Sequence, residues 1–362
     1  MKAQNISIIG LGRLGASIGL AVKQSSQNLT IIGHDRQQDV ARIAQASLGA
    51  VDKLETHARS LVARADILVL AVPISELEPL LSVIGDAIQA HTLILDFSSL
   101  KQPGLTWAAK YLAQGHYVGA SPVLAATWLS DGRTELEAAS ADLFKDSIFC
   151  LMPSPKADPQ AVETAVSFGS LLGAVPYFVD PLEYDSLVQG LEAVPGLLAA
   201  AMYRAITQSP GWRDMLRFAG LPFAQTTQPL SAGPDVAYQA LNNKIATLRW
   251  LDALIEEMKS LRQLVNAGET EMLSSIFTDL HLERQRWLAE RSKNEWAEVP
   301  ASEIQGNTIG SQFLGAFGDL EFFIGFRNGL LKCAQFLARF FADGAGAIAD
   351  GAHVDLLTTF RK

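Results

Sequence analysis

A glycine-rich turn near the start of the chain limits its fold more than any other feature. Gly10, Gly12 and Gly15 lie between the apolar run Ile6–Ile9 and a helical pattern, and Asp35 follows Gly15 by 20 residues. A lone G-x-G-x-x-G pattern is weak evidence for any function. A dinucleotide-binding turn also has a strand before it, a helix after it and an acid about 20 residues further on, and this chain has all three. The sequence therefore predicts an α/β fold with a doubly wound, Rossmann-type N-terminal domain.

Each residue of this turn has a physical reason to be there. Gly10 permits the tight turn, Gly12 lets the backbone approach a pyrophosphate, and Gly15 lets the helix pack closely on the strand. The helix then presents its first N–H groups, around Arg13 and Leu14, together with the positive end of its dipole. We therefore expect these five residues to bind the phosphates of a dinucleotide.

Residues beyond the turn complete the expected coenzyme site. Asp35 would accept hydrogen bonds from the adenosine ribose hydroxyls, which favours NAD because a 2′-phosphate would face a carboxylate. Arg36 follows directly and leaves NADP as an alternative, since an arginine there would meet that phosphate. Ala71, Val72 and Pro73 end a buried apolar run, at the crevice where doubly wound sheets bind their ligands.

Short apolar runs alternate with helical patterns through the first half of the chain. This alternation is typical of βαβ units and a mostly parallel sheet. The runs are Ile6–Ile9, Thr30–Gly33, Ile67–Val72, Leu93–Leu95, Tyr117–Val118, Ile148–Leu151 and Val175–Val179. We therefore expect a dinucleotide-binding domain over residues 1–180.

Long helical stripes replace the strand pattern after about residue 180. Their apolar residues recur every three or four positions and indicate either core or a subunit interface. They include Leu187, Leu191, Val194, Leu198, Met202, Leu241, Ile245, Leu248, Leu251, Leu254, Met258, Leu261 and Val265. We expect an all-helical domain for substrate binding and dimerisation over residues 181–298, and a Phe- and Gly-rich helical extension over residues 299–362.

The composition of the chain limits which partners it can bind and in which cellular compartment we expect it. A net charge of −9 argues against a nucleic acid or an anionic membrane as partner. Two cysteines, Cys150 and Cys333, form neither a disulfide framework nor a metal cluster and fit a reducing cytosol. The first strand leaves no room for a signal peptide, and no uncharged apolar run reaches the ~18 residues that span a bilayer. We expect a cytoplasmic protein without a metal site.

Several segments occur in an order that is known from one enzyme family. They are GLGRLGASIGLAV, HDR, ADILVLAVP, DFSSLK, YVGASP, WRDMLRFAG, Asn242–Asn243 and HLERQRWL, over roughly residues 5–292. This order resembles that of the prephenate and arogenate dehydrogenases. The resemblance implies an NAD(P)-dependent oxidative decarboxylation of a cyclohexadienyl carboxylate on the route to tyrosine. It also implies a homodimer joined through the helical domain.

The resemblance implies roles for individual residues. Arg217 in WRDMLRFAG matches an arginine that holds a substrate carboxylate, although a solvated charge on a helix face would look the same. Ser99 in DFSSLK matches the serine that hydrogen-bonds the reacting hydroxyl, and it also suits a helix N-cap. Ser121 and Tyr184 stand at two histidine positions of the family, where they would contact the substrate and pass a proton through water.

The chain departs from the family at three histidine motifs. G-x-H-P is Gly119–Pro122, E-H-D is Glu183–Asp185, and S-H-L-P-H is Glu192–Gly196. Serine cannot replace imidazole as a base near neutral pH, and His116 lies ~16 Å from Ser121 along an extended strand. General acid–base catalysis contributes about 10²–10⁴-fold.

Several functions therefore stay open. They are a slow prephenate or arogenate dehydrogenase, a related dehydrogenase for a different small cyclic carboxylate, and a catalytically silent NAD-binding protein. A β-hydroxyacid dehydrogenase is disfavoured, because no lysine occurs between Lys156 and Lys244 to supply the catalytic group of that class.

Overall fold

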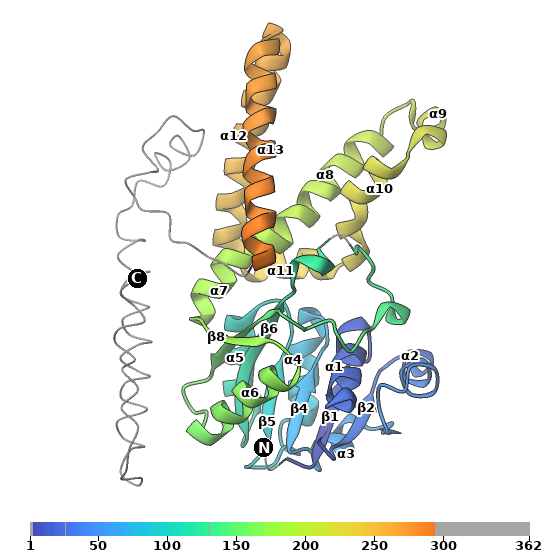
Figure 1. Ribbon diagram of the computed structural model, residues 1–362, viewed down its shortest axis with the longest axis vertical. Helices are drawn as coiled ribbons and strands as arrows, with labels where there is room; N and C mark the ends of the chain where they lie inside the picture. Colours follow the sequence, from blue (N-terminus) through green and yellow to red (C-terminus); the bar gives the residue numbers. More distant parts are fainter. Residues whose placement is uncertain (1–2, 26, 130, 294–362) are drawn as a thin grey trace. The chain divides into compact units, whose positions relative to one another are not determined.

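The computed structural model describes residues 3–25, 27–129 and 131–293, and contacts group Met1–Trp296 into one compact unit. A sheet of eight strands lies in this described part, in the order β3-β2-β1-β4-β5-β6-β7-β8 (Figure 1). The strands are β1 (Asn5–Ile9), β2 (Thr30–His34), β3 (Lys53–Leu54), β4 (Ile67–Leu70), β5 (Leu93–Asp96), β6 (His116–Val123), β7 (Ile148–Pro153) and β8 (Val175–Phe178). All neighbours are parallel except β6 and β7, so the predicted mostly parallel sheet is confirmed.

Several strand boundaries differ from the expected runs, and two of the differences bear on the site. β4 ends at Leu70 rather than at Val72, because the chain turns at Ala71 to pass over the glycine-rich turn. β6 is much longer than the run Tyr117–Val118, because its second half pairs with the antiparallel strand β7. The small residues of that half gave no apolar signal in the sequence.

The sheet is covered on both faces, which is the doubly wound arrangement. One buried cluster joins Ile6 and Ile8 of β1 to residues of α1 (Arg13–Gln24) and α6 (Pro159–Leu171). The other joins Ile9 of β1 to residues of α3 (Ala58–Val62), α4 (Ile74–Ile84) and α5 (Lys101–Tyr111). α2 (Gln38–Arg42) follows β2. Two short 3₁₀ turns, η2 (Ala126–Trp128) and η3 (Leu136–Ala138), lie between β6 and β7.

Helices alone follow from Pro181 onward in the described residues. They are α7 (Pro181–Val188), η4 (Gln189–Ala193), α8 (Val194–Thr207), α9 (Trp212–Met215), η5 (Leu216–Phe218), α10 (Leu221–Thr227), η6 (Gln228–Ala232), α11 (Asp235–Asn242), α12 (Lys244–Ala267) and α13 (Thr270–Lys293). Asp180 caps α7, since its carboxylate accepts hydrogen bonds from the N–H groups of Leu182 and Glu183. The expected extension over residues 299–362 lies outside the described residues.

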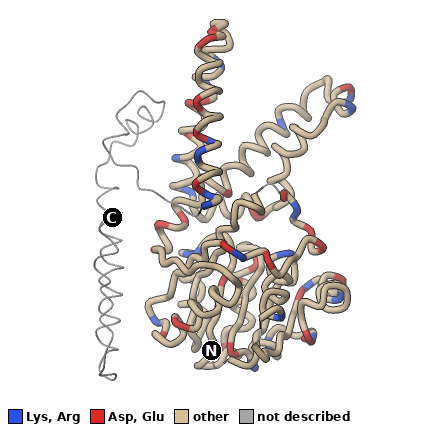
Figure 2. The backbone as a smooth tube through the Cα atoms, viewed as in Figure 1, with Lys and Arg blue, Asp and Glu red and all other residues tan. Residues whose placement is uncertain are grey.

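The helical region leaves much of its apolar surface uncovered. Ile245 is 87% exposed and Leu191 is 76% exposed, although both belong to the expected apolar stripes. Charges of both signs lie along α12 and α13, whereas the arm of α8 and α10 is charged mainly at its tip (Figure 2). Within this chain the stripes are therefore only partly core, and exposed apolar surface of this kind is typical of an interface. No described helix is long and apolar enough to cross a membrane.

Candidate active site

The glycine-rich turn after β1 requires glycine at two of its three glycine positions. Gly10 has a φ of 92°, and a Cβ there would lie 2.2 Å from the carbonyl oxygen of Ala71. A Cβ on Gly15 would lie 1.9 Å from the carbonyl oxygen of Gly10. The absence of side chains therefore lets β1, α1 and the end of β4 approach each other closely.

The third glycine faces open space and a helix end without a cap. A Cβ on Gly12 would have no described atom within 4 Å. No described side chain caps the N-terminus of α1, so its first N–H groups have no acceptor from a capping residue. An uncapped helix N-terminus beside open space suits a pyrophosphate, whose charge and acceptors would meet those N–H groups.

Asp35 is held at the end of β2 by backbone groups. Its carboxylate accepts hydrogen bonds from the N–H of Leu11 at 2.8 Å and from the N–H of Gln37 at 2.7 Å. A cavity of about 700 Å³ brings Asp35 together with other residues expected in the coenzyme site, namely Gly10, Gly12, Arg36, Ala71, Val72 and Pro73. The cavity joins the ends of β1, β2 and β4, and its residues fit NAD.

Arg13 directs its side chain away from the space above Gly12. Its guanidinium forms an ion pair with Asp131, donates to the carbonyl oxygen of Ala138 at 3.2 Å and lies 5.7 Å from the ring centre of Trp128. The residue therefore ties the connection between β6 and β7 to α1. The Leu14 side chain packs against the core. If Arg13 and Leu14 bind a coenzyme, they would therefore do so through their backbone N–H groups.

Ser99 lies just past the end of β5 with an unsatisfied hydroxyl. Its Oγ is buried and has no hydrogen-bond partner among the described residues. Lys101, fully buried two residues later, donates through Nζ to the carbonyl oxygens of Asp96 at 3.0 Å and Ala120 at 2.9 Å, and also to that of Ser98. These bonds fasten the loop that carries Ser99 to the end of β6.

Ser121 and Tyr184, 63 residues apart in the sequence, form one hydrogen-bonded pair. The Tyr184 hydroxyl donates to Ser121 Oγ over 2.6 Å, and the Tyr184 ring centre lies 5.8 Å from Lys101 Nζ. Burial raises the pKa of Tyr184 well above its usual value, so the phenol stays protonated near neutral pH. The pair can donate hydrogen bonds, but it cannot accept a proton as imidazole does.

Asp185 was not among the residues predicted from sequence, yet it connects three elements. Its carboxylate accepts hydrogen bonds from the N–H groups of Lys101 at 2.7 Å and Gln102 at 2.8 Å, and so caps α5 from α7. Its carbonyl oxygen accepts from the Asn243 amide at 2.8 Å. Burial raises the pKa of the Asp185 carboxyl to about 6. No sequence signal marks a cap that is supplied by another helix.

Glu192 is a second acid that sequence reasoning passed over. It lies in the π-helical turn η4, and Pro195, which has no N–H group to donate, follows at the start of α8. Such turns are frequent at functional sites. The Glu192 side chain is exposed, yet surrounding protein raises the pKa of its carboxyl by desolvation, which the charge of Lys101 opposes.

Arg217 is not brought to this cluster within one chain. It is exposed and lies in η5, the turn directly after α9, and α9 stands at the end of the helical arm far from the sheet (Figure 1). Tyr203, Trp212 and Phe223 hold this tip through ring contacts, with centroids between 5.7 and 6.4 Å apart. Its assignment as a substrate ligand stays a prediction and would require a site outside its own chain.

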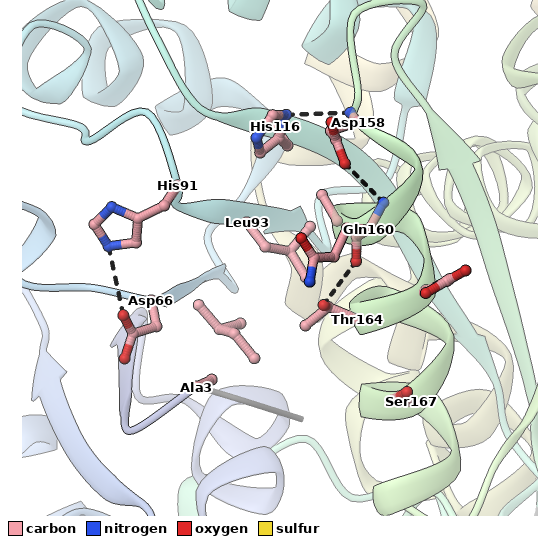
Figure 3. Close-up of a pocket in the computed structure, with 12 residues that line it drawn as sticks. Ala3, Asp66, His91, Leu93, His116, Asp158, Gln160, Thr164 and Ser167 are labelled. Carbon is pink, nitrogen blue, oxygen red and sulfur yellow. Dashed lines mark hydrogen bonds and ion pairs between the residues drawn. The ribbon is translucent and has the colours of Figure 1, made fainter. Parts of the chain in front are cut away.

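A second cavity, of about 580 Å³, lies where β4, β5 and β6 begin, at the ends of the strands opposite the coenzyme cavity. Figure 3 shows the residues that line it. His116 and Asp158 line it, and the N–H of Asp158 donates to His116 Nδ1 at 3.2 Å. His116 starts β6 and Ser121 lies near its other end, so this histidine is remote from the Ser121–Tyr184 pair, as expected. In the described residues no group of His, Cys, Asp and Glu is arranged to hold a metal.

These features define a class of protein: a Rossmann-type dinucleotide-binding domain followed by helices that bring polar groups to the same end of the sheet. Residues 18–178 match the family described as prephenate dehydrogenase, nucleotide-binding domain. Over this region the chain matches the nucleotide-binding domain of the prephenate dehydrogenases, which confirms the resemblance seen in the motifs.

Similar proteins agree with this placement. A prephenate dehydrogenase of Bacillus subtilis is 28% identical over 278 residues, 75% of this chain and 73% of the relative. A cyclohexadienyl dehydrogenase of Zymomonas mobilis is 23% identical over 282 residues, 76% of this chain and 93% of the relative.

The solved structures support the fold. The structure of Aquifex aeolicus prephenate dehydrogenase with hydroxyphenyl propionate and NAD+ has a TM-score of 0.68 at 19% identity, covering 79% of this chain and 99% of that one. The Synechocystis arogenate dehydrogenase has a TM-score of 0.59 at 21% identity, covering 78% of this chain and all of the other. At these identities the likeness is one of fold.

Proposed function

We propose that the protein is an NAD-dependent dehydrogenase that oxidises and decarboxylates prephenate or arogenate. The observation that carries the proposal is the combination of two features at the carboxyl ends of the strands. One is the NAD-fitting cavity around Gly12 and Asp35. The other is the buried hydroxyl of Ser99, which no described residue engages, on a loop that Lys101 ties to β6, the strand that carries Ser121. The relatives named prephenate and cyclohexadienyl dehydrogenase support the same reaction.

The coenzyme would be held by the first βα unit. The N–H groups at the start of α1 would bind its pyrophosphate, and Asp35 would accept hydrogen bonds from its ribose hydroxyls. When bound, NAD supplies the acceptor for the hydride that leaves C4 of the substrate ring. The residues of this chain then have two tasks: to hold the C4 hydroxyl and to remove its proton.

Ser99 would hold the reacting hydroxyl, and the proposal is supported by its buried Oγ, whose hydrogen-bonding capacity no described residue uses. Ser121 accepts a bond from Tyr184 and keeps its own proton for donation. As carbon dioxide leaves, the electrons of its bond enter the ring and charge builds on the ring oxygen. Hydrogen bonds from the Ser121–Tyr184 pair would stabilise that oxygen.

We assign the removal of the hydroxyl proton to Glu192, acting through water. The three protons of Lys101 Nζ go to carbonyl oxygens, and Tyr184 stays protonated. Both carboxylate oxygens of Asp185 accept backbone N–H groups. Glu192 is an exposed residue whose carboxyl has a pKa raised by desolvation and interacts with the charges of Lys101 and Asp185. A raised pKa makes a carboxylate a better base.

We further infer a cytoplasmic homodimer that is joined through the helical region. The exposed apolar residues of α11 and α12 support an interface, and the free thiol of Cys150 suits a reducing compartment. In such a dimer the arm of one copy would extend beyond its own sheet, and its Arg217 would reach a substrate carboxylate in the second copy.

A substrate panel tests the proposed function. The purified chain is incubated with NAD and either prephenate or arogenate, and NADH formation is followed by absorbance while the aromatic product is identified. We expect turnover with at least one of the two acids. Binding of NAD without turnover of either acid would contradict the proposal and favour a silent NAD-binding protein.

The variant Ser121→His separates a slow enzyme from one with a changed substrate. If the pocket is shaped for prephenate or arogenate, an imidazole at this position raises turnover by about 10²-fold or more. Unchanged turnover of both acids in a folded, NAD-binding variant would instead favour a different small cyclic carboxylate.

A further inference from the structure

Arg36, the residue that would admit NADP, is already paired with an acid from across the coenzyme cavity. Its guanidinium lies 2.9 Å from the carboxylate of Glu76, in the first turn of α4. Both side chains line the cavity of about 700 Å³ that also holds Asp35. Arg36 comes from the end of β2 and Glu76 from the helix after β4, so the ion pair connects two walls of the cavity.

Glu76 is held in place by the rest of α4. Ile74, Leu77 and Leu81 of this helix are fully buried against the sheet. The N–H of Ser75, the residue before Glu76, donates to the carboxylate of Asp235 in α11 at 3.2 Å. The helical region therefore anchors the turn that presents Glu76, and this acid is more than a mobile surface charge.

The ion pair with Glu76 weakens the ability of Arg36 to bind the 2′-phosphate of a nucleotide. A 2′-phosphate carries charge that an unpaired arginine binds by charge-assisted, bidentate hydrogen bonds. Glu76 engages one Arg36 donor, Nη2, and its negative charge offsets that of the guanidinium, while Asp35 adds a second carboxylate to the same end of the cavity. A ribose 2′-hydroxyl needs no cation and is unaffected by this arrangement.

We propose that Glu76 is a specificity-determining residue that makes the site select NAD over NADP by engaging Arg36. This inference rests on the coenzyme site of the proposed function and assigns its selectivity. It predicts that removal of one carboxylate, with Arg36 left in place, opens the site to NADP.

Calorimetric titration of NAD and of NADP tests the proposal without any need for turnover. In Glu76→Gln the dissociation constant for NADP should fall by about tenfold or more, which corresponds to one charge-assisted interaction. The dissociation constant for NAD should stay within about threefold, because Asp35 and the α1 N-terminus are unchanged. The double variant Arg36→Gln with Glu76→Gln should lose the gain for NADP.

Glu78→Gln is the matched control. Glu78 lies on the same helix, but its carboxylate pairs with Lys110 at 3.3 Å and Tyr111 at 3.0 Å and is not part of the cavity lining. An equal gain for NADP in Glu78→Gln would show a general charge effect and overturn the proposal. So would an unchanged NADP to NAD ratio in Glu76→Gln. Wild-type protein that binds neither nucleotide would instead contradict the coenzyme site itself.

Discussion

At the scale of single residues, the candidate site offers hydrogen-bond donors and few bases. Ser121 is a hydroxyl, and Tyr184, which donates to it, is a phenol that stays protonated. Those groups hold an oxygen well but cannot take its proton. The proposed function therefore requires another base, and we assign this role to Glu192, whose charge interacts with Tyr184 and Lys101.

The pH profile of Glu192→Gln tests this assignment. Only the carboxylate accepts a proton, so kcat should rise with pH through a pKa above the ordinary value of 4.5. Desolvation and the charge of Asp185 raise this pKa, whereas the charge of Lys101 lowers it. The variant should lower kcat by about 10²-fold and lose the acidic limb of the profile.

Glu183→Gln provides the control for that experiment. Glu183 also has a carboxyl with a raised pKa, caused by burial and by the neighbouring Asp180, but the mechanism does not use it. Its variant should keep the acidic limb. If Glu192→Gln retains both the limb and the rate, Glu192 is not the base.

The residues of the glycine-rich turn could be identified from the sequence because local geometry dictates them. Gly10 and Gly15 face backbone atoms only a few residues away or on the adjacent strand, so their identity can be read from a short pattern. Asp185 and Glu192 owe their roles to the packing of α7 and η4 against other elements, which no short pattern encodes. The position of Arg217 depends on the direction of α8, which the sequence also left open.

At the scale of elements, two glycines of the glycine-rich turn serve different purposes: Gly15 is needed for folding and Gly12 for binding of the coenzyme. Gly15→Ala places a methyl group against the Gly10 carbonyl, and we expect a loss of stability of about 1–3 kcal/mol. Gly12→Ala meets no described protein atom and should leave the melting temperature unchanged. It should nevertheless weaken NAD by about tenfold or more, since the methyl group occupies space that the pyrophosphate needs.

Thermal unfolding and calorimetry, applied to both variants, check this contrast. Gly12→Ala with wild-type affinity for NAD would place the pyrophosphate elsewhere. Gly15→Ala with wild-type stability would show that α1 does not pack on β1 as closely as the structure has it.

At the scale of the whole molecule, the fold class follows from the alternation of apolar runs, and all seven expected runs contain strands. β3 has only two residues, too few to give a periodic signal. The antiparallel strand pair β6–β7 was not foreseen, because Gly119, Ala120 and Ser121 do not look like a strand interior. The long helices were predictable, whereas the partner of their apolar faces was not.

The exposed apolar faces of the long helices predict that the chain assembles. We expect the chain to be a dimer in analytical ultracentrifugation, and the double variant Ile255→Glu with Met258→Glu on α12 to weaken the dimer by about tenfold or more. The control Val175→Glu changes an equally exposed apolar residue of the sheet and should leave the dimer intact. A wild-type monomer at all concentrations would contradict the interface and the proposed reach of Arg217.

The central claim is that hydride leaves the substrate ring for NAD at the carboxyl edge of this sheet. Prephenate and arogenate that carry deuterium at C4 test it most directly, with the protein, NAD and mass spectrometry of the nucleotide. We predict deuterated NADH together with carbon dioxide and an aromatic product from at least one of the two acids. Recovery of unlabelled nucleotide and intact acid, from protein that binds NAD, would contradict the account.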